Sequence, residues 1–174
     1  MNRSILITGV AGSGKSAICK ELKKLSYKAH DIENIRGLFT MIDKTTGKPT
    51  KDYDNYDFKK VKKHDWVCDK KKLKRLIKKN SGLVFYCGIG SNTIDIIPFF
   101  DKVFLLKANR KNTCERLTKR TSNDFGRTAE VQKWIFTWKK WWEDKMIKRG
   151  AIVINANRDI KEITSNIIKR SEKV

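Results

Sequence analysis

The feature that most constrains this chain is a glycine-rich segment at residues 9–16, which reads GVAGSGKS and matches the pattern G-x-x-x-x-G-K-[ST]. The apolar run at residues 5–7, just before it, has the composition of a buried strand. After the segment, Ile18, Leu22 and Leu25 recur on one face of a helical pattern. A glycine-rich turn that arose by chance would not lie between a buried-strand pattern and an amphipathic helix pattern. The sequence therefore predicts a strand, a phosphate-binding loop and a helix in that order.

The chemistry of this loop indicates a nucleoside triphosphate and Mg²⁺. Glycines let backbone N–H groups turn inward around an anion, Lys15 brings a positive charge to the terminal phosphates, and Ser16 offers a hydroxyl to the metal. The N-terminus of the following helix directs its dipole to the same place. The residues predicted to contact the nucleotide here are Gly9, Ala11, Gly12, Ser13, Gly14, Lys15, Ser16 and Ala17.

The length of 174 residues predicts a single domain over residues 1–174. The apolar runs are too short for a signal peptide or a membrane span, so we expect a cytoplasmic, soluble protein with no membrane partner, either a monomer or a homodimer. The four cysteines include no C-x-x-C pair, and we expect four reduced thiols.

The charge is strongly basic, because 40 Lys and Arg residues stand against 19 Asp and Glu, for a net charge of +21. Such an excess attracts polyanions, which makes nucleic acid a candidate partner. A lysine-rich composition with solvated side chains explains the charge equally well. The same two interpretations apply to a predicted basic helix at residues 69–80, in which Leu73, Leu76 and Ile77 form the apolar stripe.

Further apolar segments alternate with helical patterns along the chain, which predicts a three-layer α/β sandwich with a five-stranded parallel sheet. The four later strands are expected at residues 27–30, 82–87, 102–106 and 151–155. A long helix near residues 129–149 carries all but one of the five tryptophans, most of which we expect in the core.

Two segments interrupt this alternation. A helical piece is expected through residues 35–42, followed by an irregular stretch, and residues 43–68 are predicted to form an inserted cap on the acceptor side. The polar segment 121–128 is predicted to be a short lid. Asp31, the first acidic candidate, follows the second strand together with Glu33, at the edge where open α/β sheets bind ligands. Its carboxylate suits either a base for a hydroxyl acceptor or a ligand that orients Mg²⁺.

The order of these parts resembles the small P-loop kinases of the adenylate kinase and shikimate kinase type, and ERLTKR at residues 115–120 looks like their E-R-[LI]-x-x-R helix before the lid. The resemblance implies a sheet order of 2-3-1-4-5 and transfer of the γ-phosphoryl group of ATP to a small acceptor with Mg²⁺. It places Arg116 against the adenine and Asn157 beside the base. Arg120 and Arg127 would reach the phosphates, so the expected catalytic residues are Lys15, Asp31, Arg120 and Arg127.

The chain departs from the family in one respect. Cys87 and Gly88 stand where the nucleotide monophosphate kinases usually carry Asp-Gly, so Asp31 is the expected replacement beside Ser16 as a Mg²⁺ ligand. The sequence GIG at residues 88–90 is similar to part of the triple glycine of shikimate kinases. The predicted acceptor contacts are Asp31, Arg36, Gly88 and Gly90.

These features predict an ATP-dependent phosphotransferase whose acceptor is a nucleoside, a nucleotide or a related hydroxylated metabolite, and Asp31 favours a hydroxyl. Two alternatives stay open: a polynucleotide kinase that acts on 5′-hydroxyl ends of RNA or DNA, and an ATP-dependent nucleic-acid-binding protein without transfer activity. A GTPase is excluded because N-K-x-D and D-x-x-G are missing from plausible places. AAA-type motors need a longer chain.

Overall fold

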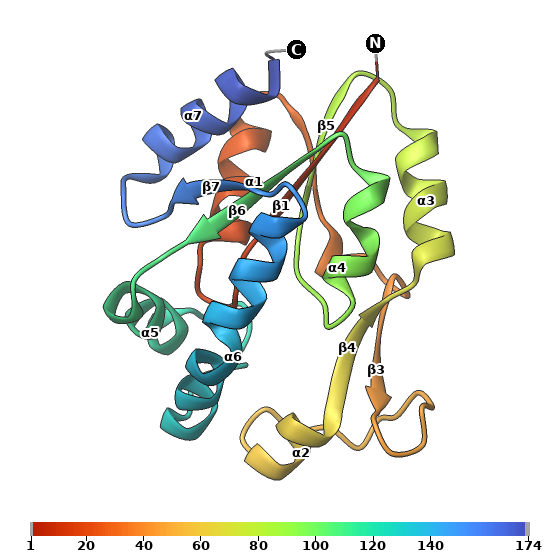
Figure 1. Cartoon of the computed structure of the whole chain (residues 1–174), viewed down its shortest axis with the longest axis vertical. Coiled ribbons are helices and arrows are strands. Elements are labelled where there is room, and N and C mark those ends of the chain that lie inside the picture. The colour runs from red at the N-terminus through yellow and green to blue at the C-terminus, as the bar shows by residue number, and fades with distance from the viewer. Residues whose placement is uncertain (1, 173–174) are drawn as a thin grey trace.

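A computed structural model describes residues 2–172 and contains a five-stranded parallel sheet (Figure 1). The strands are β1 (Arg3–Thr8), β2 (Lys28–Asp31), β5 (Leu83–Cys87), β6 (Lys102–Lys107) and β7 (Ile152–Asn155). Their order across the sheet is β2-β5-β1-β6-β7, which confirms the predicted order of 2-3-1-4-5. The carboxyl ends of all five strands meet at one edge of the sheet, because every pair is parallel.

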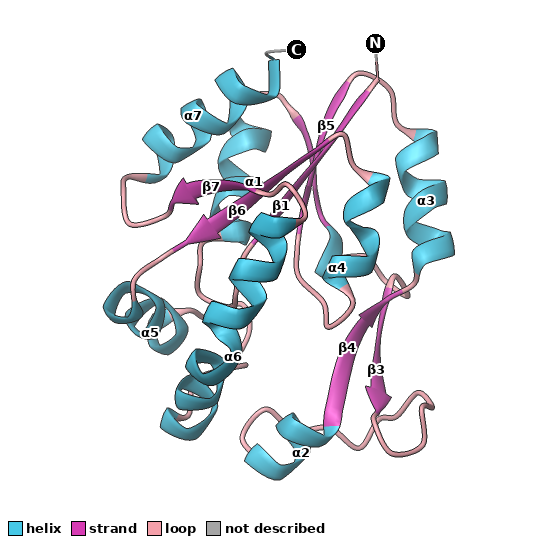
Figure 2. Ribbon diagram, viewed as in Figure 1, coloured by secondary structure: helices cyan, strands magenta, loops and turns pink. Residues whose placement is uncertain are grey.

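Helices cover both faces of the sheet, as Figure 2 shows. Helices α1 (Lys15–Lys24) and α7 (Ile160–Glu172) pack on one face. The other face is covered by α3 (Lys70–Lys79), α4 (Thr93–Ile96) and α6 (Ala129–Lys148). A 3-10 turn, η2 (Ile97–Phe99), extends α4, and α5 (Arg110–Lys119) lies at the carboxyl edge of the sheet.

The side chains of each strand alternate between the two faces of the sheet, and each face has its own hydrophobic core. In β1, Leu6 points into the core beneath α6, whereas Ile5 and Ile7 point into the core beneath α1 and α7. Tyr86 and Phe85 of β5 divide between the same two cores. Because both faces are buried, the inner strands read as continuous apolar runs, the pattern typical of a parallel sheet.

The helix expected through residues 35–42 is absent, and that prediction was wrong: residues 36–38 form a turn and a strand begins at Phe39. Strand β3 (Phe39–Asp43) pairs antiparallel with β4 (His64–Cys68), and Phe39 stacks on Trp66 with ring centroids 5.4 Å apart. This non-local pairing supplies the backbone hydrogen bonds that a helix would have supplied locally, and tertiary context overrides the helical spacing.

A short helix, α2 (Phe58–Lys63), comes between these two strands, and a 3-10 turn, η1 (Ile32–Asn34), precedes them. Figure 1 shows β3, β4 and α2 projecting below the main sheet, opposite α5 and the start of α6.

Polar side chains fix where the long helices begin. Asn109 accepts a hydrogen bond from the N–H of Asn112 at the start of α5, and Thr128 accepts one from Val131 at the start of α6. Between these helices lies the segment 121–128, at the position of the predicted lid. On α6, Trp142 is buried, Trp134 and Trp138 are partly buried against the same core and Trp141 is 57% exposed, which agrees with the expectation that most of these rings lie in the core.

Candidate phosphate-binding and transfer site

The glycine-rich loop joins β1 to α1 and is folded tightly against α5. The N–H of Ser13 donates to the carbonyl of Val10 at 3.1 Å, which closes the loop. Gly14 has a φ of 106° and begins α1 in a left-handed conformation that disfavours other residues. A Cβ on Gly12 would lie 2.8 Å from the carbonyl oxygen of Thr113, so this glycine permits the close approach of α5.

Lys15 is buried over this loop. Its ammonium donates hydrogen bonds to the carbonyls of Gly9 at 2.9 Å and Val10 at 3.3 Å. Burial lowers the pKa of Lys15, and the nearby Glu33 carboxylate opposes that effect more strongly than Asp31 does. The Lys15 charge is therefore held in a low-dielectric site beside carboxylates, where its field is little screened.

The next two residues of α1, Ser16 and Ala17, are exposed at its first turn. Ser16 thus presents its hydroxyl on the solvent side of the loop, as a metal ligand from this position must.

Two carboxylates lie at the end of β2. Asp31 is the last residue of that strand, is half-buried and pairs in register with Cys87 of β5. Glu33 lies on η1 and accepts a hydrogen bond from the N–H of Ile89 at 3.0 Å. Burial raises the pKa of the Glu33 carboxyl, and Lys15, the Ile89 N–H and Arg120 each oppose that rise.

Sequence reasoning placed Glu33 with Asp31 at the ligand-binding edge of the sheet but gave it no role in the site. The signal was its position two residues after Asp31, at the same edge of the sheet. Gly88 makes room for it, because a Cβ on Gly88 would lie 2.5 Å from Cγ1 of Ile32 and 3.2 Å from Cγ of Glu33. The predicted glycine contact with an acceptor thus coincides with a packing role for Gly88.

Arg116 connects two parts of the nucleotide side. Its guanidinium donates to the carbonyls of Ser13 at 3.2 Å, in the loop, and Ala156 at 2.8 Å, just after β7. The adjacent Asn157 accepts hydrogen bonds from the Asn109 N–H at 2.8 Å and from Nδ2 of Asn112 at 3.0 Å. The two residues predicted to border the base are therefore on neighbouring segments beside the loop.

The other two arginines come from the end of α5 and the lid. Arg120 is partly buried, and its guanidinium donates a hydrogen bond to the carbonyl of Phe125. Burial lowers the pKa of this guanidinium, and the carboxylates of Glu33 and, more weakly, Asp124 oppose that effect. The Nε atom of Arg120 has no hydrogen-bond partner in residues 2–172. Arg127 is exposed, and its guanidinium donates to the backbone carbonyl of Arg120 at 2.7 Å.

The remaining predicted acceptor residues lie nearer the cap. A Cβ on Gly90 would lie 2.8 Å from a ring carbon of Phe39 and 2.9 Å from the Trp66 carbonyl oxygen, so Gly90 lets the β3–β4 pair approach the loop after β5. Arg36 is exposed on the link between η1 and β3. The structure thus brings Lys15, Asp31, Glu33 and Arg120 into mutual electrostatic range.

The cap and the lid touch each other. The side-chain amide of Asn55 donates to the carboxylate of Asp124. Burial, together with Asp124 and Asp54, raises the pKa of Tyr53 to about 12. Helix α2 of the cap lies beside α6, so the segments on either side of the transfer site are in contact.

The residues present fit ATP with Mg²⁺. The loop carries a buried cation, and the buried Oγ of Ser13 and Nε of Arg120 have no partner among the described residues, which leaves polar groups for phosphate oxygens. Across residues 2–172, no group of three or more His, Cys, Asp or Glu side chains is placed to hold a metal alone. Mg²⁺ in kinase sites usually takes one or two protein oxygens plus phosphates and waters, a role that the hydroxyl of Ser16 and the carboxylate of Asp31 suit chemically.

Comparison with known proteins agrees with this fold. A family model described as "AAA domain" matches residues 5–137. The chain is 30% identical over 123 residues to "Adenylate kinase isoenzyme 6 homolog" of Plasmodium falciparum (isolate 3D7), a match that covers 67% of this chain and 65% of the relative. The chain thus spans less than two thirds of that relative's length.

Solved structures show the same likeness. Deoxyadenosine kinase from M. mycoides with bound dATP superimposes with a TM-score of 0.61 at 16% identity, over 98% of this chain and 100% of that one. Shikimate kinase from Acinetobacter baumannii in complex with shikimate superimposes with a TM-score of 0.53 at 14% identity, over 98% of this chain and 93% of that one. These likenesses confirm the predicted resemblance to small P-loop kinases and the three-layer fold. In addition, no helix within the described residues has the length and apolarity that crossing a membrane requires.

Proposed function

Because this chain belongs to the AAA domain family, we propose that it is an ATP-dependent phosphotransferase that moves the γ-phosphoryl group to a hydroxyl of a small acceptor. The single observation that carries the proposal is the grouping of a buried lysine, a carboxylate and an arginine beside the loop. Lys15, Glu33 and Arg120 are near enough for each to affect the pKa of another member of the group.

Each residue has a role in the proposed step. The acceptor oxygen bonds to the γ-phosphorus, the bond from that phosphorus to the β–γ bridging oxygen breaks, and ADP leaves. Lys15 and Arg120 stabilise the charge on the transferring oxygens, and Glu33 takes the proton of the acceptor hydroxyl. Ser16 and Asp31 would hold Mg²⁺, which neutralises charge on the β- and γ-phosphates when bound.

A hydroxyl acceptor suits this site better than a phosphate. Two carboxylates, Asp31 and Glu33, lie near Lys15 at the end of β2, where we expect the acceptor to bind. They would repel a second phosphate group, whereas a hydroxyl needs a base for its proton. Two of the solved structures with a similar fold are a deoxyadenosine kinase and a shikimate kinase. We therefore favour a nucleoside or a small hydroxylated metabolite as the acceptor.

The decisive experiment measures transfer of labelled γ-phosphate from ATP to a panel of nucleosides, nucleoside monophosphates, small hydroxylated metabolites and oligonucleotides with 5′-hydroxyl ends. We expect a hydroxylated small molecule to be labelled, and Lys15→Ala to lower the rate at least about 100-fold. The matched control is Lys20→Ala, an exposed lysine on the same helix. Full turnover by Lys15→Ala would overturn the proposal, and labelling of monophosphates alone would overturn the hydroxyl assignment.

A further inference from the structure

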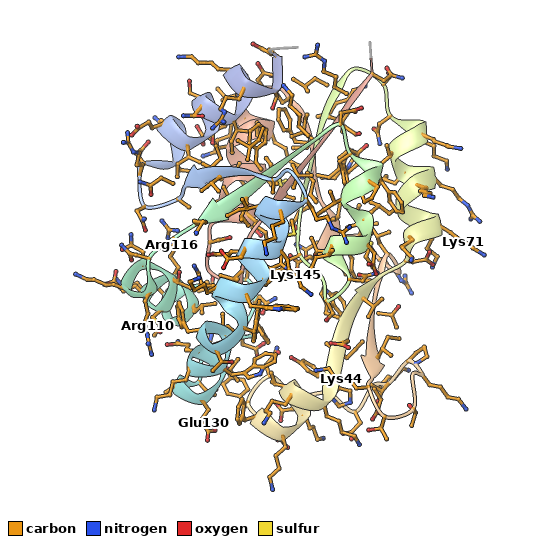
Figure 3. All side chains as sticks on the ribbon, in the orientation of Figure 1. Lys44, Lys71, Arg110, Arg116, Glu130 and Lys145 are labelled. Atoms are coloured by element: carbon orange, nitrogen blue, oxygen red, sulfur yellow. The ribbon has the colours of Figure 1, made fainter. Side chains whose placement is uncertain are left out.

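Helix α3 carries a dense cationic surface far from the glycine-rich loop in sequence. Of its ten residues, seven are exposed and basic: Lys70, Lys71, Lys72, Lys74, Arg75, Lys78 and Lys79. Figure 3 shows Lys71 pointing away from the body of the molecule. The helix anchors itself through buried Leu73 and half-buried Leu76 and Ile77, so its cations line the side that faces solvent.

Acidic neighbours pair with some of the cations elsewhere in the described residues, but with only one of the seven on α3. On α6, for example, Lys139 pairs with Glu143 at 2.6 Å, and on the cap Lys63 pairs with Asp43 at 3.3 Å. Within the described part of the chain, the one ion pair of α3 joins Lys72 to Asp69 at 3.9 Å. The surface therefore keeps nearly all of its positive charge.

Keeping this charge costs the helix free energy. Like charges four residues apart destabilise a helix by about 0.2–0.5 kcal/mol per pair. Helix α3 has four such pairs: Lys70/Lys74, Lys71/Arg75, Lys74/Lys78 and Arg75/Lys79. The cations in the first turn also lie at the positive end of the helix dipole. A bound polyanion would remove both costs at once.

We propose that α3 binds the phosphodiester backbone of a nucleic acid. Successive cations four residues apart are spaced by about 6 Å along a helix that is about 15 Å long, so an extended chain of phosphates can meet several of them together. Lysines act here as point charges, which gives sequence-independent binding. An anionic membrane is the weaker candidate, because the apolar residues of α3 face the core and leave none to insert among lipids.

This proposal goes beyond phosphoryl transfer and does not depend on it. The test uses fluorescence anisotropy without ATP, with labelled single-stranded RNA, single-stranded DNA and duplex DNA in separate titrations. The α3 variant combines Lys70→Gln, Lys71→Gln, Lys78→Gln and Lys79→Gln, which leaves Lys74 in place over the Phe99 ring. The control removes the same charge from exposed positions on α6 and α7, through Lys133→Gln, Lys148→Gln, Lys161→Gln and Lys169→Gln.

We expect the intact protein to bind at least one of the three probes, with affinity that falls as salt rises from about 50 to about 200 mM. The α3 variant should bind at least about tenfold more weakly at low salt. For a single strand, the slope of log K against log salt should also shrink by up to about 3, because each lost contact contributes about 0.7. The control variant should keep most of the affinity and the slope.

Three results would overturn the proposal: no binding to any probe at low salt, equal weakening by both variants, or binding to phosphatidylserine vesicles without binding to the oligonucleotides. Thermal unfolding separates loss of binding from loss of fold, because relief of like-charge repulsion should leave the α3 variant at least as stable as the intact protein. Transfer activity measured on the small-acceptor panel tests the kinase proposal independently.

Discussion

The carboxylate of Glu33 and the ammonium of Lys15 lie close enough that each opposes the effect of burial on the pKa of the other. Glu33 reaches this position from η1, directly after β2, whereas Lys15 reaches it from the first turn of α1. The pair joins the end of β2 to the glycine-rich loop. Of the two carboxylates at this edge, Glu33 affects the pKa of Lys15 more strongly than Asp31 does, so the two can have different roles.

Replacement of the two carboxylates should have different effects. We expect Glu33→Gln to lower kcat by about 10²–10⁴-fold while ATP binding persists, because the acceptor hydroxyl loses its base. Asp31→Asn should instead raise the Mg²⁺ concentration needed for half-maximal rate. Steady-state kinetics over a Mg²⁺ series distinguish the two variants. If Asp31→Asn abolishes turnover at saturating Mg²⁺ and Glu33→Gln does not, the roles are reversed.

The pH dependence of the proposed reaction should follow Glu33. Burial raises the pKa of this carboxyl, and the base must be ionised to accept a proton. The acidic limb of kcat/KM for the free enzyme should therefore lie above the ordinary range of a glutamate and disappear in Glu33→Gln.

A raised carboxyl pKa also affects stability. The folded state holds the Glu33 proton to higher pH than the unfolded state, so the Glu33 contribution to stability falls as pH rises from the ordinary glutamate range through the raised pKa. Urea unfolding over this pH window should show the decline in the intact protein and a smaller one in Glu33→Gln. Identical pH profiles for the two proteins would contradict the assignment.

Arg116 should contribute to ATP affinity because it joins the glycine-rich loop to the segment after β7. A lysine at this position is a point charge and cannot bridge the carbonyls of Ser13 and Ala156 with two arms of a planar fork. We expect Arg116→Lys to weaken ATP binding by about tenfold or more, measured by calorimetry. Arg110→Lys, on the same helix and over the Phe136 ring, is the matched control (Figure 3). Equal ATP affinity for both variants would remove Arg116 from the nucleotide site.

Gly12 should tolerate a methyl group poorly. Alanine at Gly12 meets both a left-handed φ of 81° and the nearby Thr113 carbonyl and Leu117 side chain. Gly47→Ala is the control, because Gly47 has a left-handed φ of 67° with open space around it. We expect Gly12→Ala to lower the free energy of unfolding by about 1–3 kcal/mol more than Gly47→Ala. Chemical denaturation measures the difference, and equal losses would show that α5 moves aside without cost.

Local sequence signals were sufficient for the sheet and the loop. Five apolar runs and the glycine pattern at residues 9–16 correctly predicted the five strands of the main sheet and the glycine-rich loop, because buried parallel strands and anion-binding turns each need residue types that few other structures tolerate. The strand order followed from the resemblance to small P-loop kinases, and the structure confirms it. Helical spacing put Arg116 and Arg120 four residues apart, but α5 ends at Lys119, so Arg116 lies on the helix and Arg120 directly follows it.

Tertiary contacts decided the rest. Strand β3 escaped prediction because it is not a buried apolar run: of its five residues only Phe39 is buried, and the apolar residues at 35, 38, 39 and 42 have helical spacing. Its pairing with β4, which lies more than twenty residues away, decides the strand. Glu33 likewise became a candidate base only when the chain placed it beside Lys15 and Arg120. A carboxylate acquires a catalytic environment from the charges and the burial around it, and residues distant in sequence supply both.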